Sequence, residues 1–428
     1  MTARELALNV LYKIEVGEGY SNITLDKELN NSELSRVDKA LASELVYGIL
    51  TWKMTLDEII KRYSSIRLKK ISPWIINILR MGIYQIAFLD KIPESAAVNE
   101  SVKLAKKYGH EASARFTNAI LRKISKNEYE LLKEYLKTTV YEEEEIIAIL
   151  TSHPVWMVTK LLKEYEKQFV IDLLNSNNKT PEITIRANTL KTSRDELIKL
   201  FELKGIECKQ GNLPHSIKLK KLNQFDDQLF VVQDEAAQLA CIKLDPKEGE
   251  MVLDACSSPG GKTTYLSALM NNTGEVDAWD IHEHRVDLVK QICKKLEVKN
   301  VIASVADATE YHLGLKEKYD RVLLDVPCSG IGVIRKKPDI KWTRNEMDLE
   351  LLRETQRLIL ECGGEYLKVG GTLVYSTCTV FKDENEQQIK EYLKKHDEFE
   401  LIDEVKLFPN VNNTDGFYIA KLTKTKSN

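Results

Sequence analysis

The 428-residue sequence lacks the patterns that mark several classes of protein. Its seven cysteines include no CxxC pair, which argues against a zinc site or a disulfide scaffold and favours a reducing cytoplasm. No apolar run approaches the ~18–20 residues that a membrane span needs, and the amphipathic N-terminus does not resemble a signal peptide. Nineteen glycines and ten prolines are too few for a collagen-like or linker-dominated chain. We therefore expect a cytoplasmic globular protein of two to four domains, at ~100–200 residues per domain.

The chain also lacks a large net charge, since its formal charge is only -3. The distribution is more informative, because residues 61–126 hold fourteen Lys or Arg and four acidic residues. This local excess of positive charge is typical of a protein that binds a polyanion. The alternative interpretation is a set of solvated helix faces with no partner.

Hydrophobic periodicity divides the chain into four predicted parts. Residues 1–140 show apolar residues at three- and four-residue spacing and predict a helical domain, followed by a helical linker over 141–170. Residues 171–244 predict a small α+β subdomain, with strands at 182–186, 217–222 and 228–232. Residues 245–428 alternate apolar strands with helices, which predicts an α/β domain with a parallel, doubly wound sheet.

A glycine-rich loop follows the first predicted strand of the α/β domain and reads DACSSPGGKT from Asp254 to Thr263. Open α/β sheets bind ligands at this edge, and glycines let a ligand approach the backbone closely. Gly261-Lys262-Thr263 also resembles the end of a P-loop, so a nucleotide triphosphatase is one interpretation. A P-loop needs glycine where Cys256 stands, and Asp254 would bring a carboxylate close to the phosphates.

Acidic residues recur at the ends of the next predicted strands. Asp280 follows the second strand, 26 residues after Asp254, and Asp307 follows the third. In dinucleotide-binding folds an acid at such a position binds ribose hydroxyls. Acids at three successive strand ends favour a neutral or cationic ligand with a ribose and an adenine, such as S-adenosylmethionine, over a triphosphate.

Two cysteines follow further strands at the same predicted edge: Cys328 in DVPCSG and Cys378 in STCT. The other cysteines have the ordinary interpretation of small buried hydrophobic residues, except Cys256, for which a backbone or packing role in the cofactor loop is expected. His282 and His284 could suggest a metal pair, but they are predicted to be exposed turn residues.

These motifs together resemble the RNA cytosine-C5 methyltransferases, and specifically the bacterial 16S rRNA enzymes called RsmB, Sun or Fmu. The resemblance rests on DACSSPGGKT, AWDIH, ADAT, LLDVPCSGIGVIRKKPDIKW and GGTLVYSTCTVFKDENE. Residues 36–52, 79–89 and 92–122 also resemble the helical RNA-binding domain of the NusB antitermination factor. The resemblance thus covers nearly the whole chain.

The resemblance implies a NusB-like helical domain, a small RRM- or ferredoxin-like α+β subdomain and a Rossmann-like methyltransferase domain. It implies that Cys378 is the nucleophile, that Cys328 assists product release, and that Asp325 and Lys262 act at the base. Cofactor contacts for S-adenosylmethionine are implied for Cys256, Ser257, Ser258, Pro259, Gly260, Gly261, Lys262, Asp280, Asp307 and Asp325. The RNA contacts that we expect are Lys69, Lys70, Arg122 and Arg186.

The expected substrate is a cytosine of 16S rRNA, of the type at position 967, acted on by a monomer without a metal ion or a membrane. From the residues alone, the choice of which cysteine attacks stays open. A different rRNA or tRNA cytosine is one alternative target. A non-catalytic RNA-binding assembly factor and a P-loop triphosphatase are the alternatives from other functional classes.

Overall fold

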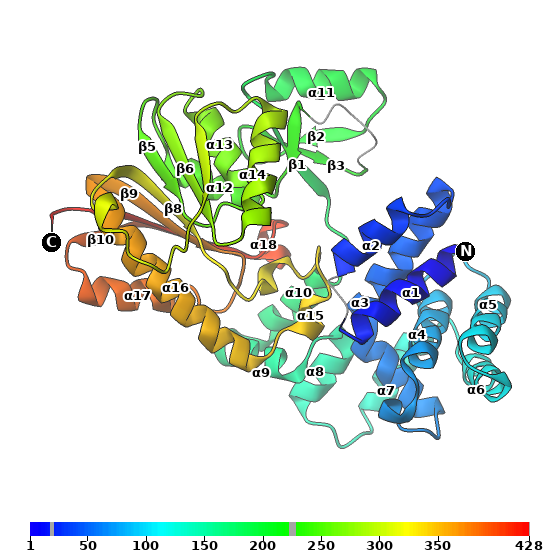
Figure 1. The fold of residues 1–428 in the computed structure, drawn as a ribbon. Helices are drawn as coiled ribbons and strands as arrows, with labels where there is room; N and C mark the ends of the chain where they lie inside the picture. The colour runs from blue at the N-terminus through cyan, green and yellow to red at the C-terminus, as the bar shows by residue number, and fades with distance from the viewer. Residues whose placement is uncertain (18–20, 222–227, 428) are drawn as a thin grey trace. The chain divides into compact units, whose positions relative to one another are not determined.

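The computed structural model describes residues 1–17, 21–221 and 228–427, which form two compact units (Figure 1). The first, called here the helical unit, consists of Met1–Lys179 together with Ile334–Thr343. The second, called the sheet unit, consists of Thr180–Val333 and Arg344–Asn428. The predicted start of the α+β subdomain at residue 171 falls within a helix of the helical unit.

The helical unit is built around α4 (Pro73–Ala87), whose residues from Ile75 to Ile86 are all buried. Ser72 caps this helix through a hydrogen bond from the Ile75 N–H, and Pro73 at the first position suits a helix start. The surrounding helices are α1 (Ala3–Glu15), α2 (Ser21–Asn30), α3 (Arg36–Tyr63), α5 (Glu94–Tyr108), α6 (Glu111–Leu121), α7 (Glu128–Leu136), α8 (Glu143–Thr151), α9 (Val155–Glu164) and α10 (Lys167–Asn177). Leucine, isoleucine and valine side chains of α1, α3 and α4 make up most of its core.

In the part of the chain that the structure describes, no single helix is long and apolar enough to cross a membrane. The pair α8 and α9 meets that criterion only when both are taken together, with a bend of 113° between them.

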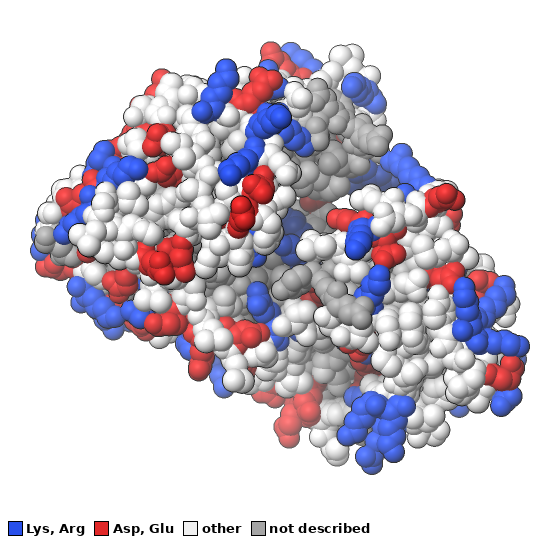
Figure 2. Space-filling model, in the orientation of Figure 1, with Lys and Arg blue, Asp and Glu red and all other residues white. Residues whose placement is uncertain are grey.

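The basic character of residues 61–126 is partly used inside the fold. Arg80 is buried, and its guanidinium donates to both carboxylate oxygens of Asp57, at 2.7 and 2.8 Å, and to Glu15 at 2.9 Å. Lys103 and Lys107 pair with Glu100 and with Glu5. The charge that this segment presents to a partner is therefore smaller than its composition suggests. On the face drawn in Figure 2, the Lys and Arg side chains of the helical unit form separate clusters, with uncharged surface between them.

The segment 334–343 belongs to the helical unit, although its sequence, which follows the Cys328 motif, predicts a place in the α/β domain. Lys341 is fully buried and donates to the carbonyl oxygens of Thr51 and Ser152 and to Asn178 Oδ1, at 2.6–3.0 Å. The indole N–H of Trp342 donates to the Leu50 carbonyl at 2.7 Å. Hydrogen bonds to helix carbonyls far away in the chain thus hold this segment, and hydrophobic periodicity carries no signal for them.

A four-stranded antiparallel sheet opens the sheet unit, in the order β2 (Cys208–Gln210), β3 (Ser216–Leu219), β1 (Ile183–Ala187) and β4 (Phe230–Val232). Helix α11 (Arg194–Leu203) covers it and buries Leu197 and Phe201 against the strands. Three of these strands fall on the predicted ranges. The short edge strand β2 was not predicted, and position 222, the last of one predicted strand, lies outside the described residues.

The second sheet has seven strands in the order β10-β11-β9-β8-β5-β6-β7. Its parallel strands are β5 (Met251–Asp254), β6 (Glu275–Asp280), β7 (Val301–Val305), β8 (Tyr319–Asp325) and β9 (Leu367–Thr377). The last two strands, β10 (Phe399–Leu407) and β11 (Phe417–Lys424), pair antiparallel at one edge. This antiparallel pair was not predicted, because β10 is largely exposed and lacks the apolar run of a central strand.

Alternate residues of the strands face two layers of helices. Val252, Leu323 and Val374 pack with α12 (Glu235–Leu244) and α13 (Gly261–Leu269) in one core. Their neighbours Leu253 and Leu324 pack in a second core with α16 (Glu346–Tyr366) and α17 (Glu386–Lys395). Helix α14 (Glu283–Leu296) contacts β6 and β7. The mixed α/β fold therefore carries the ends of its parallel strands at one edge.

Candidate active site

A cavity of about 600 Å³ lies at the carboxyl ends of the parallel strands. All of its walls come from the sheet unit, and most come from the loops that follow β5, β6, β7 and β8. Its lining residues are Ala255, Cys256, Ser258, Asp280, Ile281, His282, Arg285, Ala306, Asp307, Ala308, Thr309, Asp325, Val326, Pro327, Cys328, Thr355, Ile359 and Cys378. The structure thus brings two predicted cysteines and three predicted acids together in one cavity.

The glycine-rich loop reaches its shape through backbone contacts that other residues would disturb. Gly260 has a φ of +99°, and a Cβ on it would lie 2.5 Å from Ile292 Cγ2, so glycine is required here. The N–H and hydroxyl of Ser257 both donate to the Trp279 carbonyl, at 2.8 and 2.9 Å. Cys256 and Ser258 reach the cavity, whereas Ser257, Pro259, Gly260, Gly261 and Lys262 are not among its lining residues.

Two carboxylates that line the cavity, those of Asp280 and Asp307, are held by the turns that follow their strands. Asp280 Oδ1 accepts a hydrogen bond from the His282 N–H at 3.1 Å. Asp307 Oδ1 accepts from both the N–H and the hydroxyl of Thr309, at 2.9 and 2.6 Å. These turns orient both side chains toward the cavity, as the sequence position after each strand suggested.

Asp325 and Lys262 form an ion pair beside the cavity, with 2.5 Å between Lys262 Nζ and Asp325 Oδ2. Burial lowers the pKa of Lys262, but the charge and hydrogen bond of Asp325 outweigh burial and the net pKa lies above its ordinary value. The second oxygen of Asp325 accepts from the Ser376 hydroxyl at 2.9 Å. The pair therefore holds a fixed positive charge and a fixed acceptor next to the two cysteines.

Asp254 lies beneath the loop and is completely buried. Its Oδ2 accepts from the Thr263 hydroxyl at 2.7 Å, while its Oδ1 has no hydrogen-bond partner among the described atoms. Burial raises the pKa of Asp254 to about 7, against the hydrogen bond from Thr263, which lowers it. Asp254 thus supports the loop from below and does not line the cavity.

The two predicted cysteines meet across the loops that follow β8 and β9. Their sulfur atoms are 3.0 Å apart, and the Cys378 N–H donates to Cys328 Sγ at 3.2 Å. The hydrogen bond to Cys378, burial, and the charges of Cys378, Glu384 and Asp325 raise the pKa of Cys328 well above its ordinary value. Cys328 therefore keeps its proton and can donate it to the sulfur of Cys378.

The third cysteine that lines the cavity, Cys256, lies in the loop that follows β5. Burial and the surrounding carboxylates raise the pKa of Cys256 well above its ordinary value, so it does not form a thiolate readily. Cys241, Cys293 and Cys362 are buried, and Cys208 is half-buried.

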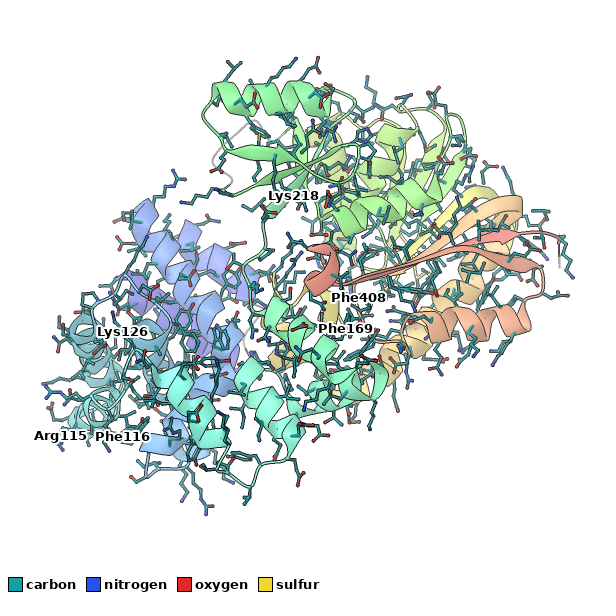
Figure 3. All side chains as sticks on the ribbon, turned by 180° about the vertical axis from the view of Figure 1, so that it is seen from behind. Arg115, Phe116, Lys126, Phe169, Lys218 and Phe408 are labelled. Carbon is teal, nitrogen blue, oxygen red and sulfur yellow. The ribbon has the colours of Figure 1, made fainter. Side chains whose placement is uncertain are left out.

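Of the four residues predicted to contact RNA, three are exposed and one is not. Lys69, Lys70 and Arg122 are exposed on the helical unit, where Figure 3 also shows the exposed Arg115 of α6. Arg186 is buried inside the sheet unit, and its guanidinium donates to Gln233, to Thr264 and to the Gly261 carbonyl. Its donors are thus used in holding β1 against α13, which corrects the expectation that Arg186 contacts RNA.

Several lining residues were missed by sequence reasoning. Ile281, Thr309, Thr355 and Ile359 line the cavity, as does Arg285, which lies 3.8 Å from Asp280. Thr309 stands in the motif ADAT and could have been found there, whereas Thr355 and Ile359 lie on one face of α16 and carry no distinguishing signal.

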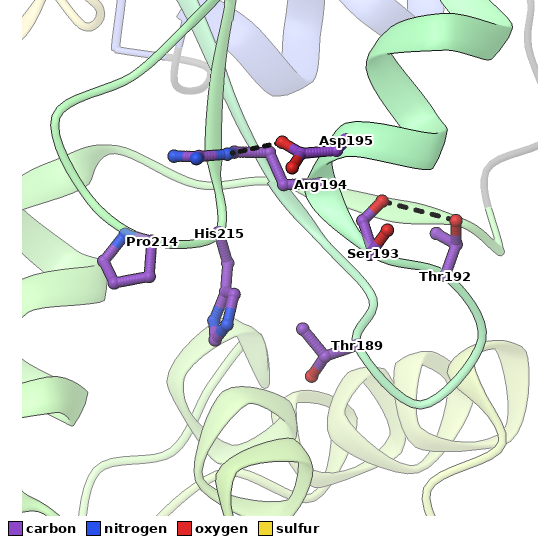
Figure 4. Close-up of a pocket in the computed structure, with 7 residues that line it drawn as sticks. All are labelled: Thr189, Thr192, Ser193, Arg194, Asp195, Pro214 and His215. Carbon is purple, nitrogen blue, oxygen red and sulfur yellow. Dashed lines mark hydrogen bonds and ion pairs between the residues drawn. The ribbon is translucent and has the colours of Figure 1, made fainter.

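A second, smaller hollow of about 280 Å³ lies at the start of α11 (Figure 4). It is lined by residues that include Ser193, Arg194, Asp195 and His215. Ser193 already caps the helix, and Arg194 pairs with Asp195 at 3.4 Å. Ser193, Arg194 and Asp195 are thus already bonded to one another or to the helix, and the larger cavity remains the candidate site.

The residues that the structure describes contain no group of three or more His, Cys, Asp or Glu that could hold a metal ion. His282 is exposed at the mouth of the cavity, and its ring stacks on His284 with centroids 5.5 Å apart.

Family models match three successive stretches of the chain. Residues 1–126 match the NusB family, residues 153–226 match the ferredoxin-like domain of RsmF/B-like methyltransferases, and residues 241–423 match the 16S rRNA methyltransferases RsmB/F. The first match lies within the helical unit, the second runs from α9 and α10 of that unit through β3 of the small sheet, and the third spans the seven-stranded sheet.

Curated relatives are similar over almost their entire length. The probable ribosomal RNA small subunit methyltransferase B of Bacillus subtilis is 35% identical, with 99% of each chain covered. The ribosomal RNA small subunit methyltransferase B of Escherichia coli K12 is 32% identical, with 96% of each chain covered. A solved structure, that of PH0851, is 27% identical, covers 99% of both chains and has a TM-score of 0.82. The chain therefore belongs to the RsmB family of S-adenosylmethionine-dependent 16S rRNA methyltransferases, with a NusB domain ahead of its methyltransferase domain.

Proposed function

We propose that this protein methylates C5 of a cytosine in 16S rRNA through a covalent bond between Cys378 and C6 of the base. One observation carries the proposal: two thiols 3.0 Å apart at the wall of a cavity that also holds Asp280, Asp307 and Asp325. A pair of thiols beside one cytosine ring suits a reaction in which one group adds to C6 and another takes the proton from C5.

The cavity suits S-adenosylmethionine in size and chemistry. Its volume of about 600 Å³ falls in the range of ordinary ligand pockets. Asp280 would accept from the ribose hydroxyls, Asp307 would face the adenine, and the loop at Cys256 and Ser258 would pack along the ligand. When bound, S-adenosylmethionine supplies an electrophilic methyl group. The carboxylates favour its positive charge over a triphosphate, which supports a methyltransferase and not the P-loop alternative.

The first step requires a thiolate at Cys378, formed when its proton passes to water. Cys328 retains its proton and can donate it toward the Cys378 sulfur, which stabilises negative charge there. The thiolate forms a bond to C6, and the electron pair of the C5–C6 bond moves to C5. C5 would then take the methyl group from the sulfonium of bound S-adenosylmethionine, whose sulfur–methyl bond breaks to leave S-adenosylhomocysteine. Asp325 would accept from the 4-amino group of the base, while Lys262 keeps a positive charge beside the ring as negative charge develops.

The second step releases the enzyme. Cys328 gives up its own proton to water, its thiolate takes the proton from C5, the C5–C6 double bond forms again, and the Cys378 sulfur leaves C6 as a thiolate. The base must enter the cavity out of its stack, so an unpaired or flipped cytosine is the expected substrate. A cytosine of the type at position 967, methylated in the cytoplasm by a monomer, is the target we propose, and another rRNA or tRNA cytosine is the alternative.

Substitution of each thiol tests the proposal. Cys378→Ser is expected to abolish methyl transfer, with less than a few per cent of activity left, while cofactor binding measured by calorimetry stays within about twofold. Cys328→Ala is expected to trap a protein–RNA adduct that persists on a denaturing gel. Cys208→Ser, a change at a half-buried thiol outside the cavity, is the matched control. An adduct with Cys378→Ala and none with Cys328→Ala would reverse the two roles.

The identity of the cytosine needs a separate measurement. Bisulfite sequencing of rRNA and tRNA from a deletion strain is expected to show loss of one protected cytosine in 16S rRNA. Loss at a tRNA cytosine, with all 16S positions retained, would favour the alternative target.

A further inference from the structure

A buried carboxylate, Glu384, lies directly behind the loop that carries Cys328. Its side chain has no solvent exposure and accepts hydrogen bonds from three donors. The Ser329 N–H donates at 2.8 Å, the Ser329 hydroxyl at 2.5 Å, and Gln356 Nε2 at 2.9 Å. All three donors are neutral, and burial raises the pKa of Glu384 despite them. A charge held this way costs free energy, so a buried glutamate here calls for a reason beyond packing.

Gln356 of α16 joins this carboxylate to the other side of Cys328. Its Nε2 donates both to Glu384 and to the Pro327 carbonyl, the second at 3.0 Å. The residues before and after Cys328 are therefore both held, one through Gln356 and the other through Glu384.

Asn385 does the same for Cys378. Its Oδ1 accepts from the Thr377 hydroxyl at 2.5 Å, and its Nδ2 donates to the Thr379 carbonyl at 3.1 Å. The hydroxyl oxygens of Ser329 and Thr379 lie 2.8 Å apart, which joins the two loops directly. All of these residues are buried, so water cannot replace the bonds.

We propose that Gln356, Glu384 and Asn385, called here the thiol clamp, are positioning residues that hold Cys328 and Cys378 in register for the reaction. This inference rests on the proposed function of the two cysteines. None of the three side chains is among the residues lining the cavity, so each acts through the loops and not on the substrate. Displacement of a reacting group by about 1 Å can lower a rate by roughly 100-fold.

Activity of clamp variants is the first test. Glu384→Ala is expected to lower kcat by about 100-fold, with the dissociation constant of S-adenosylmethionine within about twofold of wild type. Glu384→Gln can still accept from the Ser329 N–H and Gln356 while its amide donates to the Ser329 hydroxyl, so kcat is expected to stay within about fivefold. Gln356→Ala removes the hydrogen bonds to Glu384 and to the Pro327 carbonyl but leaves Glu384 bonded to Ser329. Its kcat is expected to fall about tenfold. This variant keeps the test decisive if Glu384→Ala does not fold.

A matched control separates positioning from stability. Glu398 is also buried in the sheet unit, at 2% exposure, and bonds to His396 away from the cysteines. Glu398→Ala is expected to lower the melting temperature at least as much as Glu384→Ala while leaving kcat unchanged. An equal loss of kcat in both variants would assign Glu384 a structural role only.

Thiol proximity gives a readout that does not need methyl transfer. Phenylarsine oxide binds two nearby thiols, with the arsenic–oxygen bond replaced by two arsenic–sulfur bonds and release of water. Tight binding is expected to require both Cys328 and Cys378, and to weaken at least tenfold in Glu384→Ala and in Asn385→Ala. Wild-type affinity and wild-type kcat in these variants would overturn the clamp. Weakened arsenical binding in the variants, together with a wild-type protein that methylates no RNA, would leave the clamp intact and overturn the proposed function.

Discussion

Side chains of the same type lie in different surroundings within the cavity. Cys256, Cys328 and Cys378 all line the cavity. Carboxylates surround Cys256, whereas the thiols of Cys328 and Cys378 form a hydrogen bond with each other. A sequence shows three thiols in loops after strands. The choice among them depends on which charges lie nearby, and that depends on strands brought together from distant parts of the chain.

Asp254 is expected to make stability depend on pH. Its pKa rises from an ordinary value of 3.8 to about 7 on folding, so the folded protein keeps a proton that the unfolded chain releases between these values. The stability that Asp254 contributes is therefore fully present below pH 4 and is lost as the pH rises through 7. The total loss is up to about 4 kcal/mol, at 1.36 kcal/mol for each pKa unit between the unfolded and folded values.

Asp254→Asn should remove that dependence. The melting temperature of the variant relative to wild type is expected to increase between pH 4 and 7 and then to level off. Asp287→Asn, a change at an exposed acid of α14, is the control and should show no such trend. A constant difference across this pH range would mean that Asp254 stays ionised in the fold.

Segments of the chain behave in ways that their own sequence did not predict. The stretch 334–343 connects the Cys328 loop to α16, and it packs with the helical unit through Lys341 and Trp342. Strand β1 presents one arginine, Arg186, to α13 instead of to RNA. In both cases a charged residue is buried because several acceptors surround it, and those acceptors are remote in sequence.

Lys341→Ala is expected to loosen the 334–343 segment. It removes the hydrogen bonds from the ammonium group to the Thr51 and Ser152 carbonyl oxygens and to Asn178 Oδ1, and costs about 1–3 kcal/mol for each buried acceptor left unsatisfied. Tryptic cleavage after Arg335, Lys336 or Lys337, followed by mass spectrometry, is expected to accelerate roughly tenfold. Lys316→Ala, at a half-exposed lysine of the sheet unit, is the control. Unchanged cleavage would mean that Trp342 and its neighbours hold the segment without the ammonium group.

At the scale of the whole molecule, only part of the positive charge in residues 61–126 is available to a polyanionic partner. The segment 61–126 retains exposed basic residues after its internal ion pairs are subtracted, Lys69, Lys70 and Arg122 among them. The NusB family match covers this same segment.

Salt dependence tests that surface. Replacement of Lys69, Lys70 and Arg122 with glutamine is expected to make the slope of log affinity against log salt concentration shallower by about 2–3. Each phosphate that is no longer neutralised changes this slope by about 0.7–0.9. The matched control replaces three exposed lysines of α17, Lys390, Lys394 and Lys395, with the same change in net charge. An equal flattening in the control would show that only net charge matters, and no flattening in either would place the RNA on another face.

The sequence by itself determined the fold class of each part of the chain and which side chains gather at one edge of the large sheet. Periodicity distinguishes helix from buried strand, and a residue at the end of a parallel strand must lie at one edge of its sheet, so Asp280, Asp307, Asp325, Cys328 and Cys378 could be grouped without coordinates. Only the tertiary structure decided which residues support that group. Glu384, Asn385 and Lys341 act through hydrogen bonds to residues brought near by folding, and local patterns record burial but not partners. The same limit explains the unexpected edge pair β10 and β11, whose place depends on pairing with β9.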